Sequence, residues 1–412
     1  MELLRLLTAD ARLLFVTRFA RLFAYGAVSV ILVIYLTGLG LSGSQTGLLL
    51  TLTLAGDTAI SLWLTTRADR FGRRRTLLIG AALMAAAGLA FALTRNFFFL
   101  VVAGTIGVIS PSGNEVGPFL SIEQAALSHV IPARSRTHVF AWYTLAGSIA
   151  TGLGALCAGL GVQAFQNAGV APLRSERAIV IGYAAIGLLL VALFSRLSTA
   201  AEVVRAGEAQ GPKTVLGLGE SRGVVLRLAG LFAMDAFGGG FVVQSFVAYW
   251  FFLRYHVQPA ALGGIFFGAN MFAGISALVA SPMARRIGLV KTMVFTHLPS
   301  NILLILVPLM PNVQLATLML LARFSISQMD VPTRQSYTMA IVRPEERSAA
   351  AGITGVARTS GAAIAPFFAG LLFSVPALIS WPFFIAGVMK IGYDVLLYRA
   401  FVRVRPPEEH EK

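Results

Sequence analysis

The stretch ADRFGRRRT at residues 68–76 recurs 216 positions later as ARRIGLVKT at residues 284–292, with Ala, Arg, Gly and Thr kept in register. Each copy follows a long apolar segment and carries several basic residues. A second match, at an offset of 211, aligns Glu123-Gln124 with Arg334-Gln335. Two matches at nearly the same offset, at equivalent places between apolar segments, indicate an internal duplication.

The composition places this chain in a lipid bilayer. Of its 412 residues, 57% are hydrophobic and only 12% are charged, and the mean hydropathy is +0.77. Soluble domains average roughly 45–50% apolar and about 25% charged residues. A chain with half the usual charge cannot cover its surface with groups that favour water, so much of that surface must face lipid. At about 20 apolar residues per crossing, the chain has room for about twelve helices.

Apolar runs separated by charged residues, Gly, Pro or Asn predict twelve spans. They are 13–37, 45–66, 76–94, 97–127, 138–162, 178–195, 228–252, 260–284, 292–310, 314–341, 348–373 and 381–398. We therefore expect an all-α polytopic membrane protein with two pseudo-symmetric six-helix bundles. The N-terminal bundle would cover residues 1–195 and the C-terminal bundle, with a short cytosolic tail, residues 228–412. The polar stretch 196–227 would be a cytosolic linker between them.

The distribution of basic residues predicts the orientation. Only four of the 33 Lys and Arg residues fall in the loops on one side of the expected spans, namely Arg95, Arg174, Arg177 and Arg254. Cytoplasmic loops of membrane proteins are enriched in Lys and Arg. We therefore expect both termini to be cytosolic and the protein to lie in the plasma (inner) membrane.

Several function classes are disfavoured by what the sequence contains. The net charge is +15, but the basic residues lie between apolar runs rather than along one face, so we do not expect a nucleic-acid partner. The single cysteine, Cys157, cannot form an internal disulfide framework. The five histidines have no metal-ligand spacing, and no GxxxxGK[ST] phosphate loop is found. We expect no enzyme activity, no bound metal and no cofactor other than a transmembrane proton gradient.

The loop around residues 65–75 resembles the signature of the major facilitator superfamily, roughly Gly-x-x-x-Asp-Arg-x-Gly-Arg-Arg/Lys. The chain supplies Asp69, Arg70, Gly72 and Arg73, with Thr65 where the first glycine usually stands. The later loop Pro344-Glu345-Glu346-Arg347 also resembles the family pattern. The resemblance implies a twelve-helix secondary transporter that works by alternating access.

The resemblance further implies that the signature loop is a conformational latch. Its members would be Asp69, Arg70, Gly72 and Arg73, with Arg286 in the second copy. The Asp69 carboxylate could approach the positive N-terminal end of the helix that starts near Ser348. One departure from the family disfavours a drug–proton antiporter, because residues 138–162 contain five glycines but no proline of the family's antiporter motif.

Equal numbers of acids and bases fall within the expected spans. The acids are Asp57, Glu115, Glu123, Asp235, Asp330 and Asp394, and the bases are Arg18, Arg21, Arg323, Arg334, Arg358 and Lys390. An ionised group near the bilayer centre costs a few kcal/mol, so such residues usually face a partner or a cavity. We expect pairing for many of them, with a structural role above all for Lys390 and Asp394. Asp57 is a plausible partner for Arg18 or Arg21, which share one helix face.

Two spans are expected to hold the substrate or coupling residues. In residues 314–341, Asp330 and Arg334 lie 7 and 11 positions after Arg323, which places all three on one face of a continuous helix. In residues 97–127, the run PSGNEVGP at 111–118 should break the helix and expose backbone that must line protein or a watery cavity. Glu115 in that run is the first candidate for proton or substrate binding. We expect Glu115, Asp330 and Arg334 to face one water-accessible cavity.

The function expected from these features is proton-coupled efflux of a small solute by a monomer in the bilayer. The candidate substrate or coupling residues are Glu115, Asp330, Arg334, Arg323, Glu123, Asp57, Asp235, Arg18 and Arg21. Within transport, the alternative is an organic-anion exchanger or uniporter whose intramembrane arginines bind a carboxylate or phosphate. From a different class, a membrane receptor that does not transport would need a signalling domain, for which the loops are too short.

Overall fold

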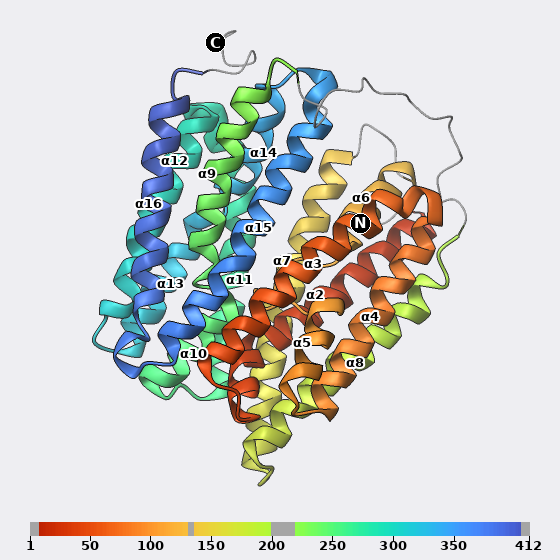
Figure 1. Ribbon diagram of the computed structural model, residues 1–412, viewed down its shortest axis with the longest axis vertical. Helices are drawn as coiled ribbons and strands as arrows, with labels where there is room; N and C mark the ends of the chain where they lie inside the picture. The colour runs from red at the N-terminus through yellow and green to blue at the C-terminus, as the bar shows by residue number, and fades with distance from the viewer. Residues whose placement is uncertain (1–7, 131–135, 199–218, 405–412) are drawn as a thin grey trace. The chain divides into compact units, whose positions relative to one another are not determined.

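The computed structural model describes residues 8–130, 136–198 and 219–404, and all regular structure in these ranges is helical. The main α-helices, shown in Figure 1, are α2 Ala9–Gly38, α3 Gly43–Phe71, α4 Arg73–Leu93, α5 Phe97–Ile106, α6 Phe119–Val130, α7 Arg136–Asn167, α8 Pro172–Phe194, α9 Arg222–Gly240, α10 Gln244–Tyr255, α11 Pro259–Ile287, α12 Leu289–Leu306, α13 Val313–Ser327, α14 Asp330–Ala340, α15 Arg347–Phe373 and α16 Trp381–Phe401. The expected all-α membrane fold is confirmed.

Ten helical segments in the described ranges are long and apolar enough to cross a membrane. The other two expected spans are interrupted. Residues 97–127 divide into α5 and α6, and residues 314–341 divide into α13 and α14. The structure therefore differs from twelve continuous helices, because Gly and Pro residues interrupt the first of these spans and a two-residue break at 328–329 interrupts the second.

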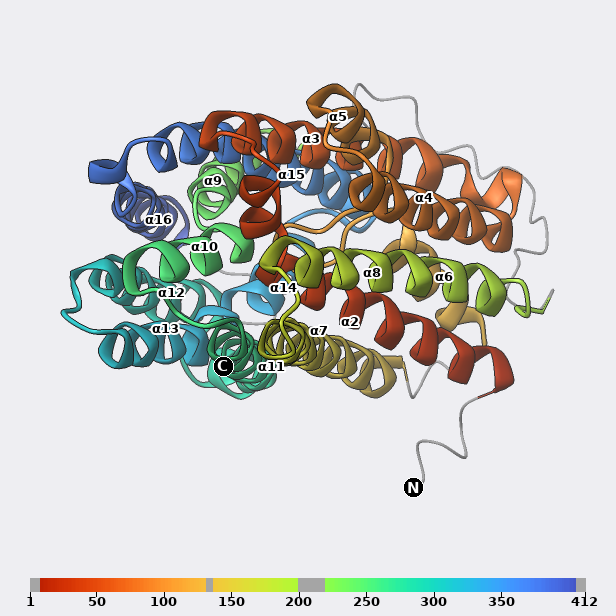
Figure 2. The ribbon, with the colours of Figure 1, turned by 90° about the horizontal axis from the view of Figure 1, so that it is seen from below.

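The chain forms two compact units. Unit 1 comprises residues 1–206 and 243–271, and unit 2 comprises residues 207–242 and 272–412. In unit 1, α2 packs against α7 and α8, and α4 packs against α8 (Figure 2). In unit 2, α9 packs against α15 and α16, and α12 packs against α13, α14 and α16. The segment 243–271, which contains α10 and the start of α11, is grouped with unit 1, so the bundle boundaries expected from the sequence stay a prediction.

Close packing of α2 on α7 depends on glycine. A Cβ atom at Gly154 would lie 1.9 Å from the Phe23 carbonyl oxygen, and one at Gly26 would lie 2.0 Å from the Thr151 carbonyl oxygen. Small residues allow helix backbones to approach closely in membranes, where dispersion contacts contribute much of the attraction. Gly154 therefore has a packing role although the proline of the family motif is missing from residues 138–162.

The two copies of the repeated loop have the same backbone geometry. Gly72 and Gly288 both have positive φ, of 95° and 88°, and each precedes a helix, α4 or α12. Thr76 and Thr292 each donate a side-chain hydrogen bond to the carbonyl of the glycine four residues earlier, at 3.0 and 2.8 Å. A positive φ favours glycine because other residues meet steric strain there. The sequence match at an offset of 216 is thus also a structural match.

Candidate functional site

The polar site of unit 1 is built around the break between α5 and α6. Residues 107–118 lie between the two helices, as expected from Pro111 and Pro118, and Gly113 and Gly117 have φ of 70° and 79°. Backbone groups buried in a membrane protein must find partners within the protein. Here side chains from surrounding helices supply them, including Ser245 on α10, whose hydroxyl donates to the Pro111 carbonyl at 2.5 Å. The broken segment is therefore a specific structure held by its neighbours.

More of these contacts come from the long helices of the unit. Tyr25 on α2 donates to the Val116 carbonyl at 3.3 Å, and Thr151 on α7 donates to the Gly113 carbonyl at 3.3 Å. Tyr183 on α8 donates to the Val108 carbonyl. Three helices and the broken segment are thus coupled, so a movement of the segment would change the hydrogen bonds of each helix.

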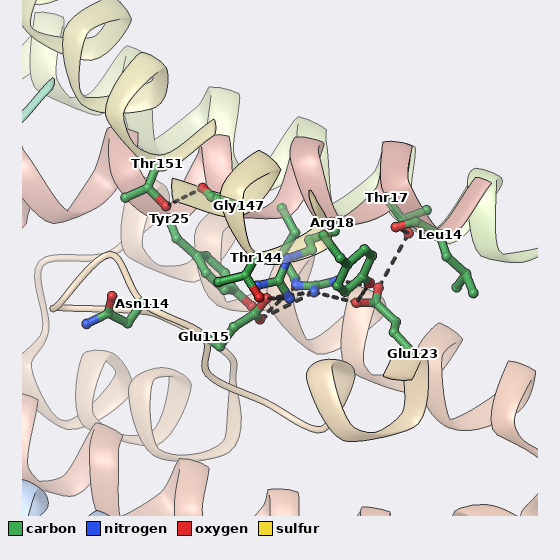
Figure 3. A network of polar contacts seen from close by, with 12 residues as sticks. Leu14, Thr17, Arg18, Tyr25, Asn114, Glu115, Glu123, Thr144, Gly147 and Thr151 are labelled. Carbon is green, nitrogen blue, oxygen red and sulfur yellow. Dashed lines mark hydrogen bonds and ion pairs between the residues drawn. The ribbon is translucent and has the colours of Figure 1, made fainter. Parts of the chain in front are cut away.

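Two arginines of α2 meet two glutamates at this break, as Figure 3 shows for Arg18, Glu115 and Glu123. Arg18 Nη1 lies 2.6 Å from Glu115 Oε1, and Arg21 Nη2 lies 3.2 Å from the same oxygen. Arg21 also binds Glu123 with two parallel hydrogen bonds, of 2.6 and 2.7 Å. Bidentate pairs of this kind are among the stronger and more directional ion pairs. Glu115 and Glu123 therefore balance the two arginine charges.

Aromatic residues enclose this ion-pair network. The Tyr143 hydroxyl donates to Glu123 Oε2 at 2.6 Å, and the Arg18 guanidinium lies 4.4 Å from the centre of the Tyr143 ring. Arg21 lies 4.4 Å from the centre of the Phe119 ring. Glu123 and Arg21 are fully buried, whereas 16% of the Glu115 side chain is exposed. Glu115 is thus the carboxylate of the network that solvent or a solute can reach.

Asp57 on α3 does not pair with an arginine, which corrects the expectation from sequence. Its Oδ1 accepts the Gly117 amide hydrogen bond at 2.6 Å and the Ser61 hydroxyl hydrogen bond at 3.3 Å. Among the described residues it forms no ion pair. The expectation was wrong because Arg18 and Arg21 turn toward the broken segment, where Glu115 and Glu123 lie within reach.

Unit 2 contains a second network, centred on Asp235 of α9. Lys390 Nζ lies 2.6 Å from Asp235 Oδ1, and Arg334 Nη1 lies 3.0 Å from Asp235 Oδ2. Arg334 also lies 3.3 Å from Asp330, four residues earlier on the same helix, a spacing at which helix side chains pair. Each of these four residues is less than a tenth exposed. A buried carboxylate needs such partners, because removing charges from water costs several kcal/mol per ion.

His297 and Asn301 extend this network in a way that the sequence analysis missed. His297 Nδ1 lies 2.8 Å from Asp394 Oδ1, and Asn301 donates to Asp394 Oδ2 at 2.9 Å. His297 Nε2 lies 3.6 Å from Asp235 Oδ1. Lys390 and Asp394 therefore both have polar partners, as expected. Lys390 contacts Asp235, and Asp394 contacts His297 and Asn301. Four-residue spacings, from 297 to 301 on α12 and from 390 to 394 on α16, were the signal available in the sequence.

Ligand atoms of Asp235, His297 and Asp330 lie within 4.8 Å of one another, close enough to bind one metal ion. Lys390 and Arg334 already contact Asp235, however. Two cations in that position repel a metal ion and occupy the carboxylate oxygens that it would use. The chemistry of this group therefore favours an ion-pair network over a metal centre.

Two further arginines of unit 2 form no ion pair with any described residue. Arg323 lies on α13 and Arg358 on α15, both are partly buried, and the Nε of each is buried without a hydrogen-bond partner. Both are within electrostatic range of Asp235 and Asp330. Since those acids already have partners, this part of unit 2 carries an excess of positive charge.

The break between α13 and α14 corrects the single stripe expected for Arg323, Asp330 and Arg334. α13 ends at Ser327 and α14 begins at Asp330, so the 100° rotation per residue does not continue from one to the other. Pro332 lies in the first turn of α14, where a proline is tolerated because the first amide hydrogens have no helical partner. The common cavity expected for Glu115, Asp330 and Arg334 stays a prediction, since Glu115 belongs to unit 1 and the other two to unit 2.

The proposed latch is only partly described. Asp69 and Arg70 belong to α3, but their side chains lie outside the described ones. Gly72 forms the turn discussed above, Arg73 is buried and Arg286 is exposed. The latch role of these five residues stays a prediction.

The second family-like loop has a local structural role. Glu346 accepts the amide hydrogen bonds of Gly219, at 2.7 Å, and Ser221, at 3.1 Å, just before α9 begins. Hydrogen bonding with Ser221 and with these amides lowers the pKa of the Glu346 carboxyl. This carboxylate therefore stabilises the start of α9, where the helix dipole favours negative charge.

Comparison with known proteins agrees with this architecture. The sequence model described as Major Facilitator Superfamily matches residues 14–329 and 255–412. This chain belongs to the Major Facilitator Superfamily. An uncharacterized membrane protein of Saccharomyces cerevisiae is 30% identical over 425 residues, which cover 96% of this chain and 94% of the yeast protein. The chain is a membrane transporter of this superfamily and not an enzyme.

Solved structures of Major Facilitator Superfamily transporters share the fold. A bacterial homologue of the human lysosomal transporter Spinster matches with a TM-score of 0.72 at 16% identity, covering 96% of this chain and 97% of that one. The nucleoside transporter NupG matches with a TM-score of 0.72 at 14% identity, covering 96% and 98%. A D-xylose–proton symporter matches with a TM-score of 0.68 at 15% identity, covering 94% and 97%. At these identities the likeness concerns the fold alone.

Proposed function

We propose that this transporter couples proton movement to the export of a small solute by alternating access. The observation that carries the proposal is Asp57, a half-buried acid on a membrane helix that forms no ion pair with a described residue. Burying a carboxylate without a cation costs more free energy than burying its protonated form. Asp57 is therefore an acid of unit 1 that can take up and release a proton.

The hydrogen bond between Asp57 and Gly117 links this acid to the broken segment. A charged carboxylate holds an amide hydrogen more strongly than a protonated one does. Gly117 lies two residues after Glu115, which binds Arg18 and Arg21. Protonation of Asp57 would thus loosen the segment that positions Glu115, and a solute that competes for Glu115 or Arg18 would feel the change.

The test uses purified protein in liposomes and a panel of solutes from different chemical classes. Once a transported solute is found, Asp57→Asn is expected to make its transport insensitive to a pH gradient, while exchange at equal pH continues. Glu176→Gln is the matched control, because Glu176 is a buried acid of unit 1 that also forms no ion pair with a described residue. Coupling that survives Asp57→Asn but is lost in Glu176→Gln would move the proton site to α8.

Export is the direction that the signature loop favours, and it can be measured separately. In inverted membrane vesicles with an acidic lumen, a proton-coupled exporter accumulates its solute. Uptake that instead requires the reverse gradient would identify an importer.

A second candidate function, organic-anion exchange, is favoured by Arg323 and Arg358. These two arginines of the membrane helices of unit 2 form no ion pair with a described residue, whereas Arg334 is held by Asp235 and Asp330. A carboxylate or phosphate binds best to the planar fork of arginine, which lysine cannot reproduce. Exchange that is lost in Arg323→Lys and Arg358→Lys and does not respond to a pH gradient in the wild type would favour this function over proton coupling.

A further inference from the structure

The end of α16 near the C-terminus lies at one end of unit 2 (Figure 1). A basic cavity lies there, lined by residues from the end of α11, the start of α12 and the end of α16. Its volume is about 640 Å³, within the roughly 300–1,000 Å³ of typical ligand pockets. Arg285, Arg286, Lys291 and Arg403 line it, and no Asp or Glu is among its lining residues. Four positive charges around a concave surface favour an anionic ligand.

The start of α12 adds to this preference. Gly288, which lines the cavity, precedes the helix with no side chain capping it. The first amide hydrogens of a helix lack intrahelical partners, and the helix dipole makes this end positive. The positive end of this helix dipole therefore adds to the basic side chains in attracting an anion.

An apolar surface continues from the cavity along α12. Phe295 and Ile302 lie 4 and 11 residues after Lys291, which places the three on one helix face. Phe295 is 55% exposed and Ile302 is 45% exposed. Tyr398, which lines the cavity, contacts Phe295 with ring centres 5.7 Å apart. The cationic hollow and the exposed apolar stripe are therefore continuous.

We propose that this end of unit 2 binds an anionic phospholipid, with its phosphate in the cavity and an acyl chain along Phe295 and Ile302. A free anion would use the cavity alone, whereas the adjoining apolar stripe fits the second half of an amphiphile. Both termini are expected to be cytosolic, which places the cavity at the membrane leaflet where anionic lipids attract basic residues. The site is separate from both ion-pair networks and does not depend on the proposed proton coupling.

The test measures lipid retention by native mass spectrometry of the purified full-length protein. We expect palmitoyl-oleoyl phosphatidylglycerol to be retained and phosphatidylcholine with the same chains to be lost. This wild-type comparison needs no variant, and equal retention of the two lipids would overturn the proposal. Glycerol 1-phosphate and inorganic phosphate form the second arm. If either competes at the same concentration as the lipid, the cavity is a small-anion site and the lipid assignment fails.

Variants then locate the site. Each basic residue near an anionic lipid contributes about 1 kcal/mol, which corresponds to about fivefold in affinity. Lys291→Gln combined with Arg403→Gln should therefore weaken phosphatidylglycerol binding roughly 25-fold. Arg399→Gln is the matched control, because Arg399 is an exposed arginine of α16 that does not line the cavity. An equal loss in the control would show general surface attraction and overturn the site.

Discussion

The buried pair of Arg21 and Glu123 provides a quantitative test of the unit 1 network. Both side chains are fully buried, and Glu123 also accepts a hydrogen bond from Tyr143. Removing one partner of a buried ion pair costs about 3–5 kcal/mol, because the other charge loses its compensation. In Glu123→Leu, Glu115 still lies 3.2 Å from Arg21 and retains part of that compensation. We therefore expect Glu123→Leu to lower the free energy of unfolding by about 3 kcal/mol, the lower limit of that range.

Removing both charges should cost much less. Replacing a buried ion pair with apolar residues of similar volume is often neutral. The variant with Arg21→Met and Glu123→Leu leaves the Tyr143 hydroxyl without its acceptor, which costs about 1 kcal/mol. The double variant should thus be more stable than Glu123→Leu alone by about 2 kcal/mol.

Thermal unfolding of the purified protein in detergent measures this difference. For a domain of 150–250 residues, 1 kcal/mol shifts Tm by about 2–4 °C, so Glu123→Leu should lower Tm by about 6–12 °C. Arg254→Met is the control, since Arg254 is exposed and forms no ion pair with a described residue. A double variant at least as unstable as the two single variants together would refute the reasoning, because it would mean that the two charges do not compensate each other.

Three further results are expected. Asp69→Asn should abolish or strongly reduce transport at unchanged membrane abundance, and normal turnover would remove Asp69 from the latch. Gly154→Ala should lower the free energy of unfolding by about 1–3 kcal/mol, since its Cβ would lie 1.9 Å from a carbonyl oxygen of α2. Gly161→Ala on the same helix is the control, because its Cβ meets only an ordinary contact at 3.6 Å and should not lower Tm. Lys390→Met should lower the free energy of unfolding by about 3 kcal/mol, because Asp235 loses a cation partner. Adding Asp235→Asn should restore part of that free energy, and no restoration would contradict the assigned pair.

The helices could be predicted from the sequence because lipid imposes a simple requirement. A long apolar run in a membrane must satisfy its backbone internally, and a helix does so without reference to the rest of the chain. The break at residues 111–118 was predictable for the same local reason, since Pro and Gly remove helical hydrogen bonds or favour other conformations. The break before Asp330 has a related local cause, since Pro332 has no amide hydrogen to bond the carbonyl of Gln328, four residues earlier.

Apart from Asp330 and Arg334, which lie four residues apart on one helix, the partners of the charges could not be predicted from the sequence. Arg21 and Glu123 are 102 residues apart, and Lys390 and Asp235 are 155 apart. Which acid a base meets depends on helix rotation and on how closely helices pack, and neither is encoded locally. His297 was overlooked for this reason, because its partner Asp394 lies on a different helix.

The two units differ in how their membrane charges are balanced, and this difference divides the proposed roles between them. Unit 1 pairs Arg18 and Arg21 with two glutamates and leaves Asp57 as an acid that has no cation partner among the described residues. Unit 2 pairs Asp235 and Asp330 with cations, whereas Arg323 and Arg358 form no ion pair with a described residue. A proton binds most favourably where an acid lacks a cation, and an anion where a cation lacks an acid. If proton coupling is lost in Asp57→Asn while solute binding persists, and binding is lost in Arg323→Lys, the two functions reside in different units. Loss of both functions in either variant alone would show that one network carries both.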